Sequence, residues 1–208
     1  MKISYAIPVC NEIVEIQRIV DYLVKHKSEQ DEIVIQYDSD NGTKAVEEWL
    51  RAKSVNQPEF TWHSFGLDNN FGAFKSRLNA LCSGDWIFQL DADEYPDEYL
   101  MQTLPHIVEA NPEVEAYWVP RCNTVQGLTQ RHINLWGWTL DSKGRVNYPD
   151  YQMRLYKNIP EMLWEGRVHE QLIGYKKFAH LPANEDFCIY HPKEIERQER
   201  QNEFYSKL

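Results

Sequence analysis

The segment GDWIFQLDADE, residues 84–94, joins a short apolar run to three acidic side chains. The run from Asp85 to Leu90 predicts a buried β-strand. In an extended segment, residues two apart point the same way, so Asp91 and Asp93 are expected to face one cation, with Ala92 turned aside. Carboxylates suit Mg²⁺ or Mn²⁺, which commonly also bind substrate phosphates. An acidic turn capping the next helix is the alternative interpretation.

Apolar runs followed by polar clusters also occur between the N-terminus and this segment. Apolar runs predict strands at residues 2–9, 32–36 and 60–64, and apolar residues three to four apart predict helices at 13–24, 43–52, 72–82 and 96–109, the last starting with a proline. This alternation predicts an α/β fold with a mostly parallel central sheet and helices on both faces. Ligands bind beyond the carboxyl ends of such strands, where residues 11–12, 38–41 and 91–94 form polar clusters.

The second half lacks this rhythm. Short strands are predicted at 116–119, 152–157, 168–173 and 187–190, and a highly charged helix at 193–208. A long polar stretch, 123–147, lies between them, and such loops in compact domains often serve function. We therefore predict a single domain over residues 1–208, divided into a first half at 1–115, a second half at 116–192 and the terminal helix at 193–208.

Composition limits the classes of function. The 208 residues carry a net charge of −10, which argues against a nucleic-acid-binding surface. The four cysteines lie far apart with no C-x-x-C pair, so we expect them to be reduced and without structural zinc. We see neither a signal-peptide pattern nor an apolar stretch of about 20 residues, and so expect a cytoplasmic protein with no transmembrane anchor.

Several segments resemble family 2 glycosyltransferases. Residues 7–12, IPVCNE, resemble the end of that family's first strand, and residues 32–35 with Asp38 resemble its second strand. Residues 71–79 and 84–94 resemble its central motif, most closely in the branch with bacterial polysaccharide and lipopolysaccharide-core glucosyltransferases. The resemblance implies the GT-A fold, with a Rossmann-like nucleotide-binding half and a smaller acceptor-side region. It also implies a nucleotide-diphosphate sugar as donor, with UDP favoured, and inversion at the anomeric carbon.

The resemblance also assigns roles to residues. It implies a donor site formed by Pro8, Asn11, Glu12, Asp38, Lys75, Arg77, Asp91 and Ala92. Asp93 would bind the metal directly, Asp91 would contact the ribose or the metal, and a late His191 would complete the metal site or touch the diphosphate. The planar guanidinium of Arg77 suits phosphate oxygens, although an exposed helix face explains Lys75 and Arg77 equally well. Glu12 could equally be a carboxylate stabilised by a helix N-terminus.

Sugar transfer with inversion requires a base that takes the acceptor proton. Glu170, in the segment VHE that resembles the same branch, and Asp150 are the two candidates, with Glu170 preferred and Asp150 favoured for positioning substrate. Trp138, Arg154 and His169 are predicted on the acceptor side, with Trp138 stacking on a sugar from a loop that closes over the site. Each of these residues could instead be structural.

Two other functions remain open at this stage. A nucleotidyltransferase that makes sugar nucleotides would also need acidic metal ligands, but no glycine-rich phosphate loop follows the first predicted strand. A non-catalytic nucleotide-sugar binder would retain the donor site without turnover. The acceptor, whether a glycan, a lipid-linked glycan or a protein, has no signature in the sequence.

Overall fold

The structure is a computed structural model that describes residues 1–56 and 60–205. The first half alternates strands and helices: β1 (Ile3–Val9), α1 (Ile13–His26), β2 (Glu32–Asp38), α2 (Lys44–Asn56), β3 (Phe60–Phe65), α3 (Phe71–Asn79), β4 (Trp86–Gln89), β5 (Tyr95–Pro96) and α4 (Glu98–Ala110). The second half contains β6 (Ala116–Val119), β7 (Arg121–Gln126), α5 (Gln130–Trp136), β8 (Gln152–Lys157), β9 (Leu163–Glu165), β10 (Gln171–Ile173), β11 (Phe178–His180), a 3₁₀ turn (Glu185–Phe187), β12 (Ile189–Glu194) and α6 (Ile195–Tyr205).

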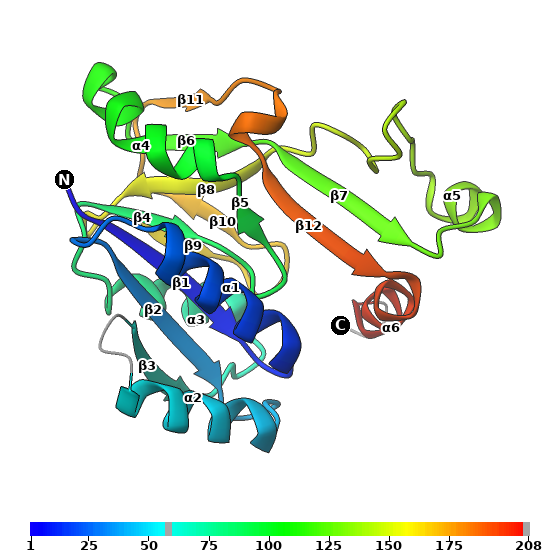
Figure 1. The fold of residues 1–208 in the computed structure, drawn as a ribbon, viewed down its shortest axis with the longest axis horizontal. Coiled ribbons are helices and arrows are strands. Elements are labelled where there is room, and N and C mark those ends of the chain that lie inside the picture. Colours follow the sequence, from blue (N-terminus) through cyan, green and yellow to red (C-terminus); the bar gives the residue numbers. More distant parts are fainter. Residues whose placement is uncertain (57–59, 206–208) are drawn as a thin grey trace.

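The centre of the molecule is a seven-stranded sheet in the order β11-β6-β8-β4-β1-β2-β3 (Figure 1). Strands β1 to β4 pair in parallel, as do β6 and β11, whereas β8 runs antiparallel to both of its neighbours. The predicted α/β fold with a mostly parallel sheet is therefore confirmed. The strand β8 joins the two halves of the chain into one sheet.

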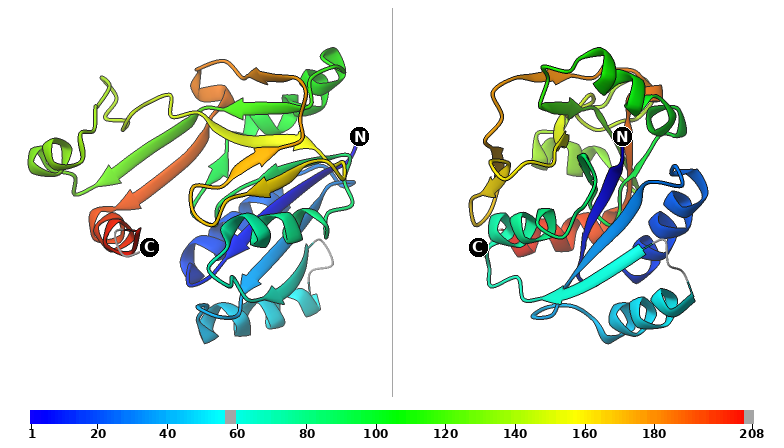
Figure 2. Two further views of the ribbon diagram at one scale, coloured as in Figure 1. Left: turned by 180° about the vertical axis from the view of Figure 1, so that it is seen from behind. Right: turned by 90° about the vertical axis from the view of Figure 1, so that its left-hand side faces the viewer.

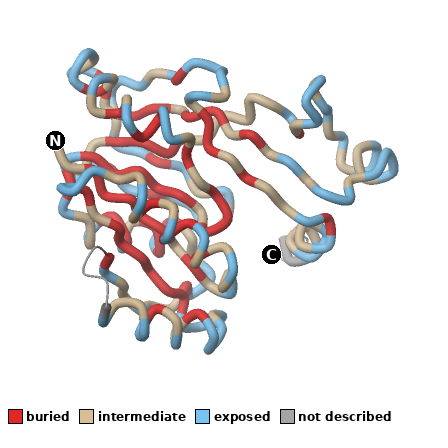
Figure 3. The backbone as a smooth tube through the Cα atoms, in the orientation of Figure 1, coloured by how far each residue is buried: buried red, intermediate tan, exposed pale blue. Residues whose placement is uncertain are grey.

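Apolar side chains cover both faces of this sheet. On one face, α1, α2 and α4 supply Ile19, Leu50 and Leu104 to a core with β-strand residues such as Ile35 and Phe88. The opposite face is covered by α3 and by the β9–β10 hairpin, through the side chains Leu78, Trp164 and Leu172. Figures 2 and 3 show these two layers and the buried strands between them. The prediction of helices on both faces is confirmed.

An arm extends from the sheet. Strands β7 and β12 pair in parallel along its length, with α5 at its far end and α6 beside it (Figure 1). The polar stretch 123–147, predicted as a loop, thus contains most of β7 and all of α5. No helix among the described residues is both long and apolar enough to cross a bilayer.

Some predicted boundaries are wrong. Pro96 does not begin a helix: it lies in β5 opposite Ile189, and α4 begins at Glu98 after Asp97, whose carboxylate accepts a hydrogen bond from the backbone N–H of Tyr99 at 2.8 Å. The strand predicted at 168–173 is restricted to 171–173, and that at 187–190 shifts to 189–194. Residues 206–208 of the predicted terminal helix lie outside the described residues.

Candidate functional site

The acidic segment after β4 forms a turn. The backbone N–H of Glu94 donates to the carbonyl of Asp91 at 2.9 Å, and a carboxylate oxygen of Glu94 accepts from the N–H of Asp91 at 3.0 Å. The prediction that Asp91 and Asp93 lie in an extended segment is therefore wrong, whereas their binding of one cation stays a prediction. In the turn the two carboxylates take different partners, while the buried Ala92 packs into the core.

Asp91 faces cations that come from both halves of the chain. Its Oδ2 lies 2.5 Å from Nη2 of Arg154, and its Oδ1 lies 4.0 Å from Nζ of Lys75. Lys75 also binds Oε1 of Glu170 at 2.6 Å and lies 4.8 Å from the ring centroid of Trp164. Burial opposes the ionisation of Asp91, but Arg154 and Lys75 outweigh it and hold its pKa well below the usual range.

Asp93 faces a second set of positive groups. Its Oδ2 lies 3.3 Å from Nε2 of His191, 3.3 Å from Nη2 of Arg197 and 4.0 Å from Nζ of Lys193. Burial opposes ionisation here too, but the hydrogen bond with His191 and the charges of Lys193 and Arg197 hold the pKa of Asp93 below its usual range. Asp93 is thus an ionised carboxylate in a strongly basic environment.

Asp93 and His191 together offer two ligands for a divalent cation. The described residues contain no group of three or more His, Cys, Asp or Glu side chains placed to hold a metal. However, Mg²⁺ usually takes one or two protein ligands together with water and substrate phosphates, at about 2.1 Å. Two adjacent ligands of an octahedral ion at that distance lie about 3 Å apart, close to the 3.3 Å between Asp93 Oδ2 and His191 Nε2.

A hydrogen bond behind His191 supports the same pairing. The other ring nitrogen, Nδ1, lies 2.7 Å from Oδ1 of Asn123, which leaves Nε2 directed at Asp93. Metal-binding histidines commonly donate their second nitrogen to an oxygen in this way. The pair Asp93–His191 therefore fits Mn²⁺ or Mg²⁺ if a diphosphate completes the coordination, whereas Asp91 is committed to Arg154 and Lys75.

Glu94 links Arg154, which binds Asp91, to Arg121. Its side chain is fully buried, and Oε1 lies 2.9 Å from Nη1 of Arg121 and 2.7 Å from Nη2 of Arg154. Arg121 in turn binds Oδ2 of Asp150 at 2.7 Å. The Nε of Arg154 is a buried polar atom without a hydrogen-bond partner among the described residues.

The two candidate bases differ in their surroundings. Asp150 accepts hydrogen bonds from Arg121, from Asn123 at 2.6 Å and from Gln152 at 3.0 Å. Burial opposes its ionisation, but Arg121 and these hydrogen bonds lower its pKa. Glu170, in contrast, has Lys75 as its ion-pair partner. Because Asp150 already accepts several hydrogen bonds, it is poorly placed to accept a substrate proton, and this favours Glu170 as the base.

The predicted nucleotide-side residues lie at the ends of β1 and β2. Glu12 accepts hydrogen bonds from the N–H groups of Cys10 and Asn11 and lies 3.5 Å from Arg197, which also pairs with Glu15. Asp38 ends β2 and accepts from the N–H groups of Asp40 and Leu67, which fixes the loop after β3. Pro8 lies in β1, opposite Gln36 of β2. Of these residues, Glu12 is linked to Asp93 through Arg197, and the donor role of all of them stays a prediction.

Three predicted residues lie outside those clusters. The guanidinium of Arg77 lies 4.7 Å from the ring centroid of Phe65. Trp138 follows α5 at the end of the arm, and its ring contacts Trp136, with 4.6 Å between centroids (Figure 1). His169 is an exposed loop residue with φ of 57° beside Glu170. Among the described residues, neither Arg77 nor Trp138 forms an ion pair or hydrogen bond with Asp91 or Asp93.

Sequence reasoning missed five residues of the site: Glu94, Arg121, Asn123, Lys193 and Arg197. Two of them had a signal. Glu94 directly follows Asp93, and Lys193 lies two residues after His191, so each adjoins a predicted metal ligand. Arg121 and Asn123 carry no such signal, because only the pairing of β7 with β12 brings them to the site.

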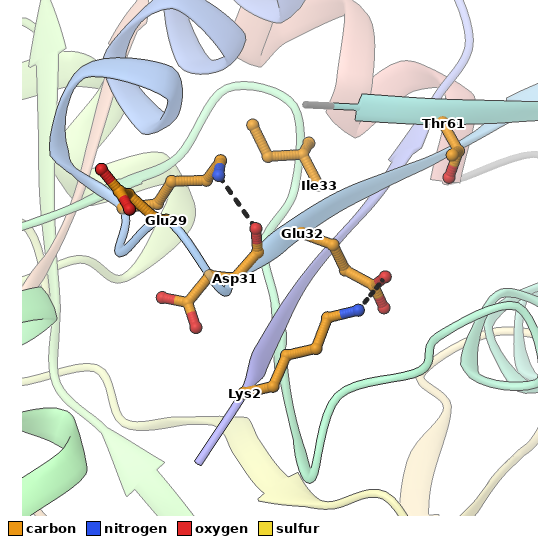
Figure 4. A pocket seen from close by; sticks show the side chains of 7 residues that line it. Lys2, Glu29, Asp31, Glu32, Ile33 and Thr61 are labelled. Carbon is orange, nitrogen blue, oxygen red and sulfur yellow. Dashed lines mark hydrogen bonds and ion pairs between the residues drawn. The ribbon is translucent and has the colours of Figure 1, made fainter. Parts of the chain in front are cut away.

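A separate cavity of about 340 Å³ lies at the opposite edge of the sheet, lined by Lys2, Lys27, Glu29, Asp31, Glu32, Ile33 and Thr61 (Figure 4). Both of its lysines already have partners: Lys2 binds Glu32 at 2.7 Å, and Lys27 donates to the carbonyl of Asp31 at 2.9 Å. Parallel sheets bind ligands at the carboxyl ends of their strands, and this cavity is at the amino ends. The candidate site is therefore the charged cluster at the carboxyl edge.

Comparison with known proteins supports this reading of the fold. The profile of the family described as Glycosyl transferase family 2 matches residues 4–168. The crystal structure of S. aureus TarS 1-349 is similar with a TM-score of 0.64 and 12% identity, over 92% of this chain and 60% of that one. Its complex with UDP-GlcNAc is similar with a TM-score of 0.66 and 14% identity, over 93% and 59%. This chain thus spans about three fifths of the length of those structures.

Proposed function

The chain belongs to glycosyl transferase family 2, and from that premise we propose that it transfers a sugar from a nucleoside-diphosphate donor to an acceptor hydroxyl with inversion, aided by Mn²⁺ or Mg²⁺. The observation that carries the proposal is the cluster at the carboxyl edge of the sheet. There, ionised Asp91 and Asp93 are surrounded by Lys75, Arg154 and Arg197. A diphosphate is the kind of anion that such cations, drawn from distant segments, can bind.

The donor diphosphate would lie between Asp93 and the basic side chains. Asp93 and His191 would hold the divalent cation, which supplies positive charge to the leaving group when bound. Lys193 and Arg197 would turn from Asp93 and Glu12 to the phosphate oxygens, since both already lie within 4.0 Å of the Asp93 carboxylate. UDP is the favoured nucleotide, because a structure with the same fold is a complex with UDP-GlcNAc.

Glu170 would take the proton of the acceptor hydroxyl. The acceptor oxygen then bonds to the anomeric carbon as the bond from that carbon to the phosphate oxygen breaks, and the electron pair leaves with the diphosphate. Lys75 contacts both Glu170 and Asp91, at 2.6 Å and 4.0 Å, so it links the base to the donor side. The donor site would therefore extend beyond residues 1–115, because His191, Lys193 and Arg197 surround Asp93.

Donor hydrolysis tests the proposal. We expect the protein to release nucleoside diphosphate from at least one of UDP-glucose, UDP-galactose, UDP-GlcNAc and GDP-mannose in Mn²⁺, and to lose this activity in EDTA. Asp93→Asn should lower the rate by about 100-fold or more, as expected for loss of a group that holds transition-state charge. Asp186→Asn is the matched control, because it makes the same substitution at an exposed aspartate.

Other outcomes would replace the proposal. Release of pyrophosphate from a nucleoside triphosphate and a sugar phosphate would identify a nucleotidyltransferase. Binding of a sugar nucleotide without any turnover in either metal would identify a non-catalytic binder. An unchanged rate in Asp93→Asn would remove Asp93 from the donor site.

A further inference from the structure

Aromatic rings form a continuous row at one edge of the sheet. They are Trp118 in β6, Phe178 and His180 in β11, Tyr151 just before β8, and Tyr175 after the β9–β10 hairpin. Phe178 is 48% exposed and His180 is also exposed, while the other three are half-buried. Exposed apolar rings gathered in one place mark a binding surface more often than single exposed residues do.

The rings of this aromatic row are held in fixed positions. His180 lies opposite Trp118 in the β11–β6 pair, with ring centroids 6.0 Å apart and ring planes at 11°. Tyr151 and Phe178 meet His180 at steep angles, with centroids 4.9 Å and 5.8 Å away. The hydroxyl of Tyr151 donates to the carbonyl of Leu181 at 2.9 Å. A surface arranged in this way loses little conformational freedom when it binds a ligand.

The row lies on the same face of the sheet as Glu170. Trp118 and Tyr175 pack against the core that contains Trp164 of β9, and Glu170 follows β9 in the same hairpin. Ala179 packs against the core on the other face, so its neighbours Phe178 and His180 point to the Glu170 side. The row also adjoins the charged cluster along the chain, because Tyr151 directly follows Asp150.

We infer that this aromatic row binds a sugar ring of a saccharide acceptor and directs its hydroxyl toward Glu170. Aromatic faces pack against the C–H faces of sugars, and the ring nitrogens of His180 can hydrogen-bond to hydroxyls. A lipid tail would bind less well to this row, because its central ring is a polar histidine. The inference rests on the proposed function, which it extends by naming the acceptor class.

Binding of the full chain to immobilised maltoheptaose, chitohexaose and a deacylated lipopolysaccharide core, with UDP and Mn²⁺ present, tests the inference. We expect binding to at least one saccharide, weakened about tenfold or more in Phe178→Ala and in His180→Ala. Tyr99→Ala is the matched control, because Tyr99 is an aromatic residue of α4 that is 50% exposed. A rise in the melting temperature with UDP checks that each variant is folded and retains its donor site.

The inference is overturned if no saccharide binds while UDP still raises the melting temperature, or if both variants bind as the wild type does. It is also overturned if the protein binds phosphatidylglycerol vesicles rather than saccharides, and if the two variants lose this vesicle binding. In each of these outcomes the proposed function survives, because UDP binding is intact. Absence of any UDP effect in the wild type would instead remove the proposed function and this inference with it.

Discussion

The two edges of the central sheet carry charge in different ways. At the amino edge, Glu32 accepts hydrogen bonds from the side chains of Lys2 and Ser4 and from both the backbone and the hydroxyl of Ser83, all within 2.7 Å. Burial raises the pKa of Glu32, but these bonds outweigh it and lower the pKa to about 2. At the amino edge, Glu32 is therefore held by nearby partners that stabilise the fold.

At the carboxyl edge the partners come from α3, β8, β12 and α6, which converge only in the folded chain. Asp91 remains 36% exposed in its side chain, although Arg154 binds it. Cations gathered around a few carboxylates can be transferred to an anionic ligand, whereas the amino-edge pairs have no such use. The difference suggests that the amino edge contributes mainly to stability and the carboxyl edge mainly to binding.

Glu170→Gln gives the largest expected effect and separates the two candidate bases. The rate of donor hydrolysis should fall by about 10² to 10⁴-fold, since a glutamine cannot take the proton, while UDP affinity stays within threefold. Rapid-quench rates and calorimetric titration of UDP measure the two quantities. Asp150→Asn is the comparison variant. We expect it to lower the free energy of unfolding, because Arg121 loses its partner, and to slow donor hydrolysis less than Glu170→Gln does. A larger rate loss in Asp150→Asn than in Glu170→Gln would make Asp150 the base.

Glu94→Gln should have the next largest effect, and this effect is on stability. Its carboxylate is fully buried between Arg121 and Arg154, and removal of the negative charge leaves two buried guanidinium groups without full compensation. We expect the free energy of unfolding to drop by about 3–5 kcal/mol, as measured by urea denaturation. A drop below 1 kcal/mol would show that water already solvates the two arginines, and that the carboxyl-edge network contributes little to the fold.

The fold could be predicted well because the patterns that identify strands and helices lie within short segments of the sequence. Apolar runs and helical spacing within the first 110 residues identify β1 to β4 and the four helices to within a few residues. Within the site, Lys75, Asp91, Asp93, Arg154, Glu170 and His191 were predicted and are brought together in two adjacent clusters. Their partners could not be predicted, because the contacts of Arg121 and Arg197 depend on how the arm pairs and where α6 lies.

One local prediction failed for a physical reason. An alternating rule places Asp91 and Asp93 on one side of a strand, but the strand ends at Gln89. Glu94 then folds back onto the N–H of Asp91 and closes a turn. The buried side chain of Glu94, three residues after Asp91, thus helps to close this turn, and no periodicity within the segment predicts it.

Glu32→Gln should show the stabilising role of the amino edge through pH. The folded-state pKa of about 2 lies below the ordinary value of 4.5, so the ionised form stabilises the protein above about pH 4.5, and this contribution is lost as pH falls toward 2. We expect the variant to be less stable by about 1–3 kcal/mol at pH 7, with the difference shrinking from pH 4.5 down to pH 2. Donor hydrolysis at pH 7 should be unchanged; a difference in stability that is as large at pH 2 as at pH 7 would contradict the assignment to this carboxylate.

Replacing a lysine by methionine at each edge gives the smallest effect and the most direct comparison. Lys2 forms a partly exposed ion pair with Glu32, so Lys2→Met should lower stability by no more than about 1 kcal/mol and should leave UDP affinity unchanged.

Lys193 is only 8% exposed in its side chain and lies 4.0 Å from Asp93. Because burying its charge costs free energy, Lys193→Met should leave the melting temperature equal or higher while UDP binds at least fivefold more weakly. Uridine, which lacks phosphates, should bind both variants as it binds the wild type. If Lys193→Met instead lowers stability more than Lys2→Met and UDP binds normally, the charges at both edges serve the fold alone, and the distinction between them fails.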